Sequence, residues 1–359
     1  MAECYIADMK KNKPARTARK KSSPVKTISL ALQGGGAHGA YSWGVLDRLL
    51  ADDRLRIEGI SGTSAGAMNA VVLAHGMVKG GSTGARDALK CFWDSIADMP
   101  GFGAFTNPLV EKYVLHWQLD QLPQYQFFDQ LSRSLSPYQL NPFNVNPLRQ
   151  LLKKFVDFEL IQKTDHLSLF VSATNVRTGR ARIFSRPEIT LDALLASACL
   201  PYLFQAVEID GDPYWDGGFV GNPPLWPLYE TMTTPDLMLV NINPLERVGT
   251  PANARDIINR MNEISFNSTL MLEMRSVDFV QRLLNDNKLD PKKYRRIYMH
   301  MVDAEDRLRA YDASSKLNND RGFIDELFTI GYQTAELWLQ NHFDDLGQRP
   351  TVNIRRKFL

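Results

Sequence analysis

Short apolar runs and longer amphipathic runs alternate along the first part of the chain. Residues 27–32 and 56–60 are β-prone, and each run is followed by a turn rich in glycine and serine. After each turn, apolar side chains recur at helical spacing, over residues 37–50 and 65–77. A strand, a small-residue turn and a helix, occurring twice in succession, predict the start of a mostly parallel α/β sheet.

Further along, the pattern predicts three more strands, at 167–174, 237–242 and 296–302. It also predicts helices at 86–97, 191–199, 252–285 and 323–341, with a loop at 80–84. Residues 99–147 differ, because prolines and aromatic residues are interleaved there. We expect short helices or irregular structure in this segment, which either caps the sheet or forms a satellite core.

These changes in composition and predicted secondary structure divide the chain into three parts. We expect a basic disordered tail at 1–26 and an α/β domain at 27–250 that carries the cap-like insertion at 99–147. A mainly helical extension at 251–359 is expected to pack on the same domain. The length of 359 residues allows one large domain with insertions or two domains.

Composition excludes several classes of protein. Hydrophobic residues make up 44% and charged residues 23%, which is average for a globular chain and excludes collagen-like, coiled-coil and wholly disordered proteins. The three cysteines are widely spaced and form no CxxC, so neither a disulfide framework nor a thiolate zinc site is expected. A reducing, cytoplasmic environment is the simplest interpretation.

Positive charge is concentrated at the start of the chain. Residues 1–26 have a net charge of about +6, whereas the whole chain has only +2, so the remainder is acidic. We therefore expect no nucleic-acid partner for the folded part. The tail is either a solvated arm or a weak contact for an anionic membrane or lipid granule. No signal peptide is visible, and the uncharged windows 27–46 and 59–78 are too polar to span a bilayer.

The first candidate motif is GGGAHG at residues 34–39, directly after a predicted strand. Glycines at a strand-to-helix turn leave backbone N–H groups free to bind an anion, either a phosphate or a carbonyl oxyanion. The pattern matches GxGxxG, so a dinucleotide site and a simple packing turn both remain open.

The second motif is GTSAG at residues 62–66, again between a strand and a helix. In a GxSxG elbow the serine occupies a strained backbone position that exposes its hydroxyl, and the next N–H points at a developing oxyanion. This context favours Ser64 as a nucleophile over a plain turn serine. Because few residues separate the two motifs, a right-handed crossover should place both turns at the same sheet edge.

The third motif, DGGFVGNPP at residues 216–224, would by itself be an ordinary turn. Together with GGGAHGAYSWGVL at 34–46 and GTSAG, in this order, it makes residues 27–224 resemble the patatin-like phospholipase family. The resemblance implies a three-layer α/β/α fold and a serine acyl hydrolase of the lipase or phospholipase A type. It implies no cofactor and no metal.

The resemblance also implies roles for individual residues. Ser64 corresponds to the nucleophile and Asp216 to the base of a Ser–Asp dyad, supported by Gly62, Gly66, Gly217 and Gly218. The oxyanion hole is expected from the glycine loop together with the residue after the nucleophile: Gly34, Gly35, Gly36, Ala37, His38, Gly39 and Ala65. His38 departs from the family, which usually has Arg or Lys there, and this puts a preference for charged phospholipid in doubt.

Two alternatives remain. One is an α/β-hydrolase triad of Ser64, Asp216 and His300, which has the right chain order, although the apolar surroundings at 297–302 favour a structural histidine. The other is a non-catalytic nucleotide-binding protein that uses the glycine loop with Asp53 or Glu58 as the ribose-binding acid. The sequence does not identify the ester (phospholipid, neutral lipid or acyl polymer) or the oligomeric state.

Overall fold

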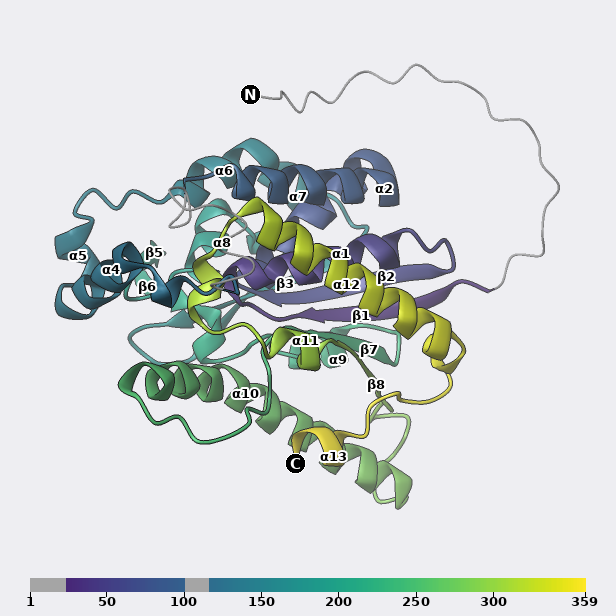
Figure 1. Cartoon of the computed structure of the whole chain (residues 1–359). Helices are drawn as coiled ribbons and strands as arrows, with labels where there is room; N and C mark the ends of the chain where they lie inside the picture. Colours follow the sequence, from purple (N-terminus) through teal and green to yellow (C-terminus); the bar gives the residue numbers. More distant parts are fainter. Residues whose placement is uncertain (1–23, 101–115) are drawn as a thin grey trace.

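A mixed sheet runs through the described part of the chain, residues 24–100 and 116–359, in this computed structural model (Figure 1). Its central strands are parallel, in the order β3-β2-β1-β7-β8, and β4, β6 and β5 add antiparallel pairs beyond or beside β3. The strands are β1 Lys26–Leu32, β2 Leu55–Thr63, β3 Ser168–Asn175, β4 Ala181–Ser185, β5 Val207–Ile209, β6 Asp212–Asp216, β7 Asp236–Asn241 and β8 Tyr298–Asp303.

Helices cover both faces of this sheet (Figure 1). Successive strand side chains point to opposite faces, so Leu30 and Leu32 join one buried cluster and Ala31 joins another. The first cluster includes side chains of α1 (Gly39–Leu50), α2 (Ala65–Ala97), α6 (Pro147–Phe155), α7 (Phe158–Lys163), α8 (Leu191–Ser197) and α12 (Arg321–His342). The second includes those of α9 (Trp226–Thr231), α10 (Ala254–Asn285) and α13 (Ile354–Phe358). The predicted three-layer α/β/α fold is confirmed.

Helix α12, near the end of the chain, is built into the first layer. It packs against α1 with almost no side chain between the two backbones. A Cβ atom at Gly44 would lie 2.0 Å from the Phe328 carbonyl oxygen, and one at Gly331 would lie 2.0 Å from the Tyr41 carbonyl oxygen. This close packing ties the C-terminal segment to the helix that follows the glycine loop.

Two expectations from the sequence need correction. The predicted loop at 80–84 is only a kink within α2, because non-helical backbone angles are confined to Gly80 and Gly81. Lys26 belongs to β1, not to the tail, and its Nζ donates to three backbone carbonyls beyond α12. Residues 1–23 lie outside the described residues, and no helix within the described ranges is long and apolar enough to cross a bilayer.

Of the segment at 99–147, the structure describes residues 99–100 and 116–147. The segment contains α4 (Pro123–Ser134) and α5 (Pro137–Leu140), and α6 begins at its last residue, so short helices are found there as expected. Three of its aromatic side chains are largely exposed: Phe127 at 70%, Tyr138 at 58% and Phe143 at 89%. These three side chains therefore lie outside any core, whereas Trp117 of the same segment is buried in the first cluster.

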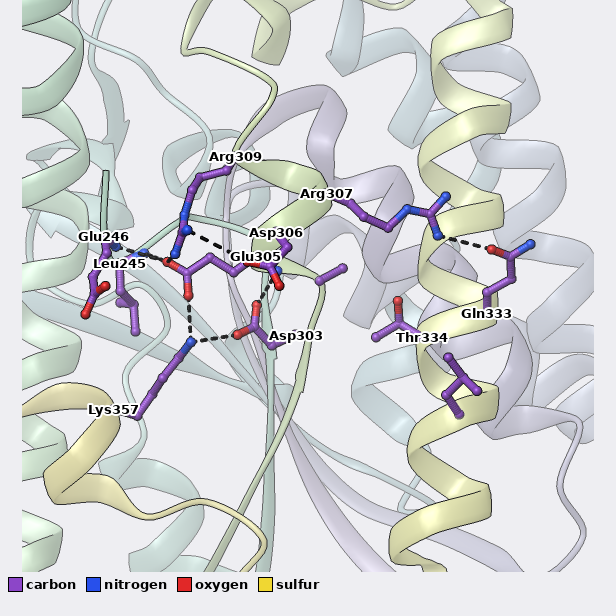
Figure 2. A pocket seen from close by; sticks show the side chains of 12 residues that line it. Leu245, Glu246, Asp303, Glu305, Asp306, Arg307, Arg309, Gln333, Thr334 and Lys357 are labelled. Carbon is purple, nitrogen blue, oxygen red and sulfur yellow. Dashed lines mark hydrogen bonds and ion pairs between the residues drawn. The ribbon is translucent and has the colours of Figure 1, made fainter. Parts of the chain in front are cut away.

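A charged cluster fastens the end of the chain to the sheet, beside a cavity of about 450 Å³ (Figure 2). At its centre Glu305 accepts hydrogen bonds from the N–H groups of Leu245 and Glu246, both at 3.0 Å, and from Lys357 of α13 at 2.6 Å. Lys357 also pairs with Asp303, at 2.9 Å. Burial alone would raise the pKa of Glu305, but the Lys357 ammonium and the other donors outweigh it and lower that pKa to about 2.

This cluster predicts a specific loss of stability in acid. A carboxyl whose folded pKa lies below its usual 4.5 stabilises the fold above that pH and loses this contribution as the pH falls toward 2. Replacing Glu305 by Gln should therefore lower the free energy of unfolding at pH 7 by about 1–2 kcal/mol, after allowance for solvent screening. The difference from the unsubstituted protein should shrink as the pH approaches 2.

Urea unfolding at a series of pH values measures this difference. Glu159→Gln, at an exposed ion pair with Lys163, is the matched control and should change stability little at any pH. A stability difference for Glu305→Gln that stays constant from pH 7 to pH 2 would contradict the assignment.

Candidate active site

Ser64 stands at a sharp turn between β2 and α2. Its backbone angles, φ 53° and ψ −122°, lie where non-glycine residues are seldom found. The flanking glycines allow the turn, because a Cβ at Gly66 would lie 2.2 Å from the Leu32 carbonyl oxygen and one at Gly62 would lie 2.7 Å from the Gly66 carbonyl carbon. The chain thus forms the elbow geometry that the GTSAG motif predicts.

Asp216 ends β6 and is only 1% exposed. Its Oδ1 accepts a hydrogen bond from Gly218 N–H at 2.7 Å, and the Ser64 side chain lies close enough to its carboxylate to lower the pKa of that group. The backbone is held by Thr174 Oγ1, which donates to the Asp216 carbonyl at 2.7 Å. The two residues that the sequence proposed as a dyad therefore lie side by side, although Ser64 follows β2 and Asp216 ends β6.

Burial changes the acidity of Asp216. Loss of solvent raises its pKa to about 7, although the hydrogen bond from Gly218, the nearby Ser64 hydroxyl and the charge of Lys316 act in the opposite direction. A carboxylate with a pKa near neutrality is a far better proton acceptor than one near 4.

The glycine loop lies directly against Ser64. A Cβ at Gly34 would approach the Ser64 Cβ to 2.8 Å and the Thr63 carbonyl oxygen to 2.7 Å. At Gly36, φ is +57° and a Cβ would lie 2.2 Å from the Lys316 carbonyl oxygen. Glycine is therefore required at both positions by close backbone approach, and at Gly36 by the left-handed conformation as well.

Not every N–H group of this loop is available to a ligand. The Gly34 N–H donates to Asn222 Oδ1 at 2.6 Å, His38 N–H donates to the Gly35 carbonyl, and Gly39 N–H donates to carbonyls of the same short helix, Gly36–His38. Within residues 24–100 and 116–359, the N–H groups of Gly35, Gly36, Ala37 and Ala65 have no such acceptor. The Gly34 N–H therefore stabilises the conformation of the loop and is not available to bind an oxyanion.

The third motif holds the other two together. Ser61 Oγ donates to the Pro224 carbonyl at 2.6 Å, and Thr63 Oγ1 donates to the Gly221 carbonyl at 2.7 Å. Asn222 of the same motif is fully buried and bonds to both backbone groups of Gly34. The segment after Asp216 therefore fixes the elbow and the glycine loop relative to each other.

Other residues around the site were not found from the sequence. Ser197 Oγ accepts the Ser64 N–H at 2.9 Å, and Asn243 Nδ2 donates to the Gly34 carbonyl at 2.9 Å. Asn243 follows β7 at the carboxyl edge of the sheet, and that position could have drawn attention to it. Ser197 has no comparable signal, because its role depends on where α8 packs.

His38 does not carry a charge at the glycine loop. Its side chain is buried, its Nε2 lies 2.8 Å from Ser315 Oγ, and its ring packs edge-on against Tyr311 and Phe323. Burial, together with the nearby charges of Lys316 and Arg247, lowers its pKa well below 6.5. His38 therefore packs the loop against the C-terminal segment and is neutral at pH 7.

The residues that would distinguish the triad and the nucleotide-binding site, namely His300 and Asp53 or Glu58, lie away from Ser64. Both ring nitrogens of the buried His300 have other partners, Asp236 Oδ1 at 2.9 Å and Thr351 Oγ1 at 3.1 Å. Glu58, proposed as a ribose-binding acid, accepts hydrogen bonds from Thr233 and Thr234, which precede β7 at the amino edge of the sheet. Asp53 is exposed and precedes β2, at that same edge. His300 is therefore not a triad partner of Ser64, and neither Asp53 nor Glu58 lies at the glycine loop.

The cavity of Figure 2 is not part of this site. Its lining comes from the C-terminal segment and the residues after β7, and its acidic centre is already bonded by Lys357 and Arg309. Among the described residues, no group of three or more His, Cys, Asp or Glu side chains is arranged to hold a metal ion.

Comparison with known proteins agrees with this geometry. The family model for patatin-like phospholipase matches residues 30–229, which contain all three motifs. The chain belongs to the patatin-like phospholipase family. Membership supports hydrolysis of lipid esters at the level of the family. No curated protein matches the chain by sequence.

Several solved structures are similar over most of the chain, among them VipD and ExoU. VipD from Legionella pneumophila is 16% identical, with a TM-score of 0.44, and the match covers 89% of this chain and 68% of VipD. Full-length ExoU, in complex with SpcU of the Pseudomonas aeruginosa type III secretion system, is 15% identical with a TM-score of 0.32. That match covers 89% of this chain and 54% of ExoU. The family assignment therefore rests on the sequence match and not on these structures.

The contact between the glycine loop and the elbow predicts that Gly34 cannot take a side chain. Gly34→Ala should lower the free energy of unfolding by about 1–3 kcal/mol, since the new methyl group meets the Thr63 backbone and Ser64 Cβ. Gly80→Ala, where a Cβ would meet open space, is the matched control and should stay within about 0.5 kcal/mol of the unsubstituted protein. Urea unfolding measures both, and equal stability of the two variants would contradict the close approach.

Proposed function

We propose that this protein is a serine acyl hydrolase that cleaves carboxylic esters of lipids through a Ser64–Asp216 dyad and an acyl-enzyme. The observation that carries the proposal is Ser64 in a strained elbow beside a buried carboxylate, Asp216, whose pKa is raised to about 7. The family match supports the reaction class. The carboxylate can act as the base without a histidine, because its proton affinity is raised by burial.

In the first half of the reaction, Ser64 Oγ attacks the ester carbonyl carbon while its proton passes to Asp216. The resulting oxyanion is stabilised by backbone N–H groups, for which Gly35, Gly36, Ala37 and Ala65 are the candidates. Collapse of this intermediate breaks the bond to the alcohol. The alcohol leaves with the proton from Asp216, and the acyl group remains on Ser64.

In the second half, Asp216 accepts a proton from a water molecule as that water attacks the acyl-enzyme. Collapse of the second intermediate releases the carboxylic acid, and the proton held by Asp216 returns to Ser64 Oγ. The chemistry requires the same two side chains in both halves and leaves the protein unchanged.

The substrate is expected to be a lipid ester, either a phospholipid or a neutral lipid, or an acyl polymer with accessible esters. Residues 1–25, which hold seven Lys or Arg against Glu3 and Asp8 and so have a net charge of +5, would provide weak contact with an anionic membrane or lipid granule. We also propose that the chain divides into a catalytic domain at 27–250 and a helical extension at 251–359. The extension packs on the catalytic domain, because side chains of α12 share a buried cluster with those of α1 and α2.

The dyad predicts the effect of two substitutions. Ser64→Ala and Asp216→Asn should each lower kcat for p-nitrophenyl butyrate by at least about a thousandfold, because they remove the nucleophile and the base. A serine-directed organophosphonate should label Ser64, as detected by peptide mass spectrometry, and should not label Ser64→Ala.

His300→Gln is the control that separates the dyad from a triad. It should keep kcat while lowering stability, because both ring nitrogens of His300 serve packing around Asp236 and Thr351. Substantial turnover by Asp216→Asn, or loss of turnover in a folded His300→Gln variant, would overturn the dyad.

The raised pKa of Asp216 predicts the pH dependence. The base must be unprotonated to accept the Ser64 proton, so kcat/KM should rise about tenfold per pH unit below about 7 and level off above it. The measurement is the initial rate on p-nitrophenyl butyrate between pH 5 and 8.5, with non-enzymatic hydrolysis subtracted. A profile that is already level at pH 5 would contradict a base with this acidity.

A further inference from the structure

The glycine loop lacks a cation of its own, yet a lysine from the C-terminal segment lies against it. Lys316 belongs to a short 3-10 helix, Ser314–Leu317, outside the region matched by the family model. Its backbone carbonyl oxygen would lie only 2.2 Å from a Cβ at Gly36. The preceding residue, Ser315, bonds to His38, so this short helix contacts the loop at two successive positions.

The Lys316 ammonium is directed toward the catalytic groups. Its Nζ donates to Asn243 Oδ1 at 2.8 Å, and Asn243 in turn donates to the Gly34 carbonyl beside Ser64. Its charge acts on the carboxylate of Asp216. Phe266, whose ring centre lies 6.0 Å from Nζ, also packs over Gly218 next to Asp216. Lys316 therefore lies at the edge of the proposed active site.

This ammonium has spare hydrogen-bonding capacity in a poorly solvated position. An ammonium group has three N–H donors, and the partner found for Lys316 is one neutral amide oxygen. In the part of the chain that the structure describes, no carboxylate lies within 4.0 Å of its Nζ. Burial lowers the pKa of Lys316, because the charged form loses solvation there and no anionic group among the described residues is hydrogen-bonded to it. A bound anion would offset that loss.

We propose that Lys316 binds a phosphate-type anion of the substrate beside the scissile ester, and so supplies the charge that His38 does not. This inference rests on the proposed function of Ser64. It makes Lys316 a specificity-determining residue, which favours phospholipids over neutral esters. A purely structural role, in which Lys316 only holds Asn243 against Gly34, would affect all substrates equally.

Lys316→Met keeps the aliphatic stem and removes the charge, and Lys316→Arg restores a cation. The substrates are monomeric dihexanoylphosphatidylglycerol, which carries the anion, and neutral p-nitrophenyl butyrate. Loss of a charge-assisted contact should lower the ratio of kcat/KM for the phospholipid to that for the neutral ester about tenfold or more in Lys316→Met. Lys316→Arg should recover part of it. Lys288→Met, at an exposed ion pair, is the control for a lost surface charge and should leave the ratio unchanged.

Other outcomes overturn the proposal. An equal fall in kcat/KM on both substrates in Lys316→Met would show that the residue only holds the loop.

Inhibition by inorganic phosphate tests the same site. Phosphate should inhibit neutral-ester hydrolysis competitively in the unsubstituted protein and more weakly in Lys316→Met. Phosphate inhibition that depends on Lys316, without a change in the substrate ratio, would mean that the site takes free phosphate and not the lipid.

A binding measurement tests the anion site at Lys316 independently of the proposed hydrolysis. In the Ser64→Ala background, calorimetric titration with monomeric dihexanoylphosphatidylglycerol should show at least about tenfold weaker binding when Lys316→Met is added. That result would support the anion site even if no ester were turned over. Equal binding by the two proteins, or binding by neither, would overturn the anion site whatever the outcome for hydrolysis. A comparison of thermal melting verifies that both variants are folded.

Discussion

The active-site arrangement depends on how closely the glycine loop passes the nucleophile. Strands β1 and β2 are parallel neighbours, so the turns that follow them emerge at the same edge of the sheet. At that edge the Gly34 backbone lies where any side chain would meet Ser64 and Thr63. The N–H groups next to it are thereby brought to the nucleophile. The glycines of the first motif are explained by this contact.

Holding this contact has an energetic cost that other parts of the site offset. A positive φ at a serine costs about 1–3 kcal/mol, and a buried carboxyl loses the solvation of its charged form. The segment after Asp216 compensates by hydrogen bonding to Ser61, Thr63 and Gly34. The same burial that makes Asp216 costly as an anion raises its pKa toward neutrality, where it is useful as a base.

The C-terminal segment belongs structurally to the site, although the family match ends before it. Helix α12 packs on α1, and the short helix before α12 contacts Gly36 and His38. Asn243, also beyond residue 229, orients the Gly34 carbonyl. The glycine loop is therefore enclosed by residues from both parts of the chain, and variation in the C-terminal segment can alter the site without changing any of the three motifs.

The resemblance of the three motifs to a known family implied the three-layer fold and the pairing of Asp216 with Ser64. The sequence by itself determined the order of the main strands and helices and Ser64 as a candidate nucleophile. These follow from local features: hydrophobic periodicity, glycines at strand ends and a strained-turn motif all act within a few residues. Only the tertiary structure decided that Asn222 occupies the Gly34 N–H, that His38 is buried and neutral, and that Lys316 lies against Gly36. It also showed that the predicted loop at 80–84 is a kink. Burial and hydrogen-bond partners depend on residues that are distant in the chain, and no local pattern in one sequence records which of them will meet.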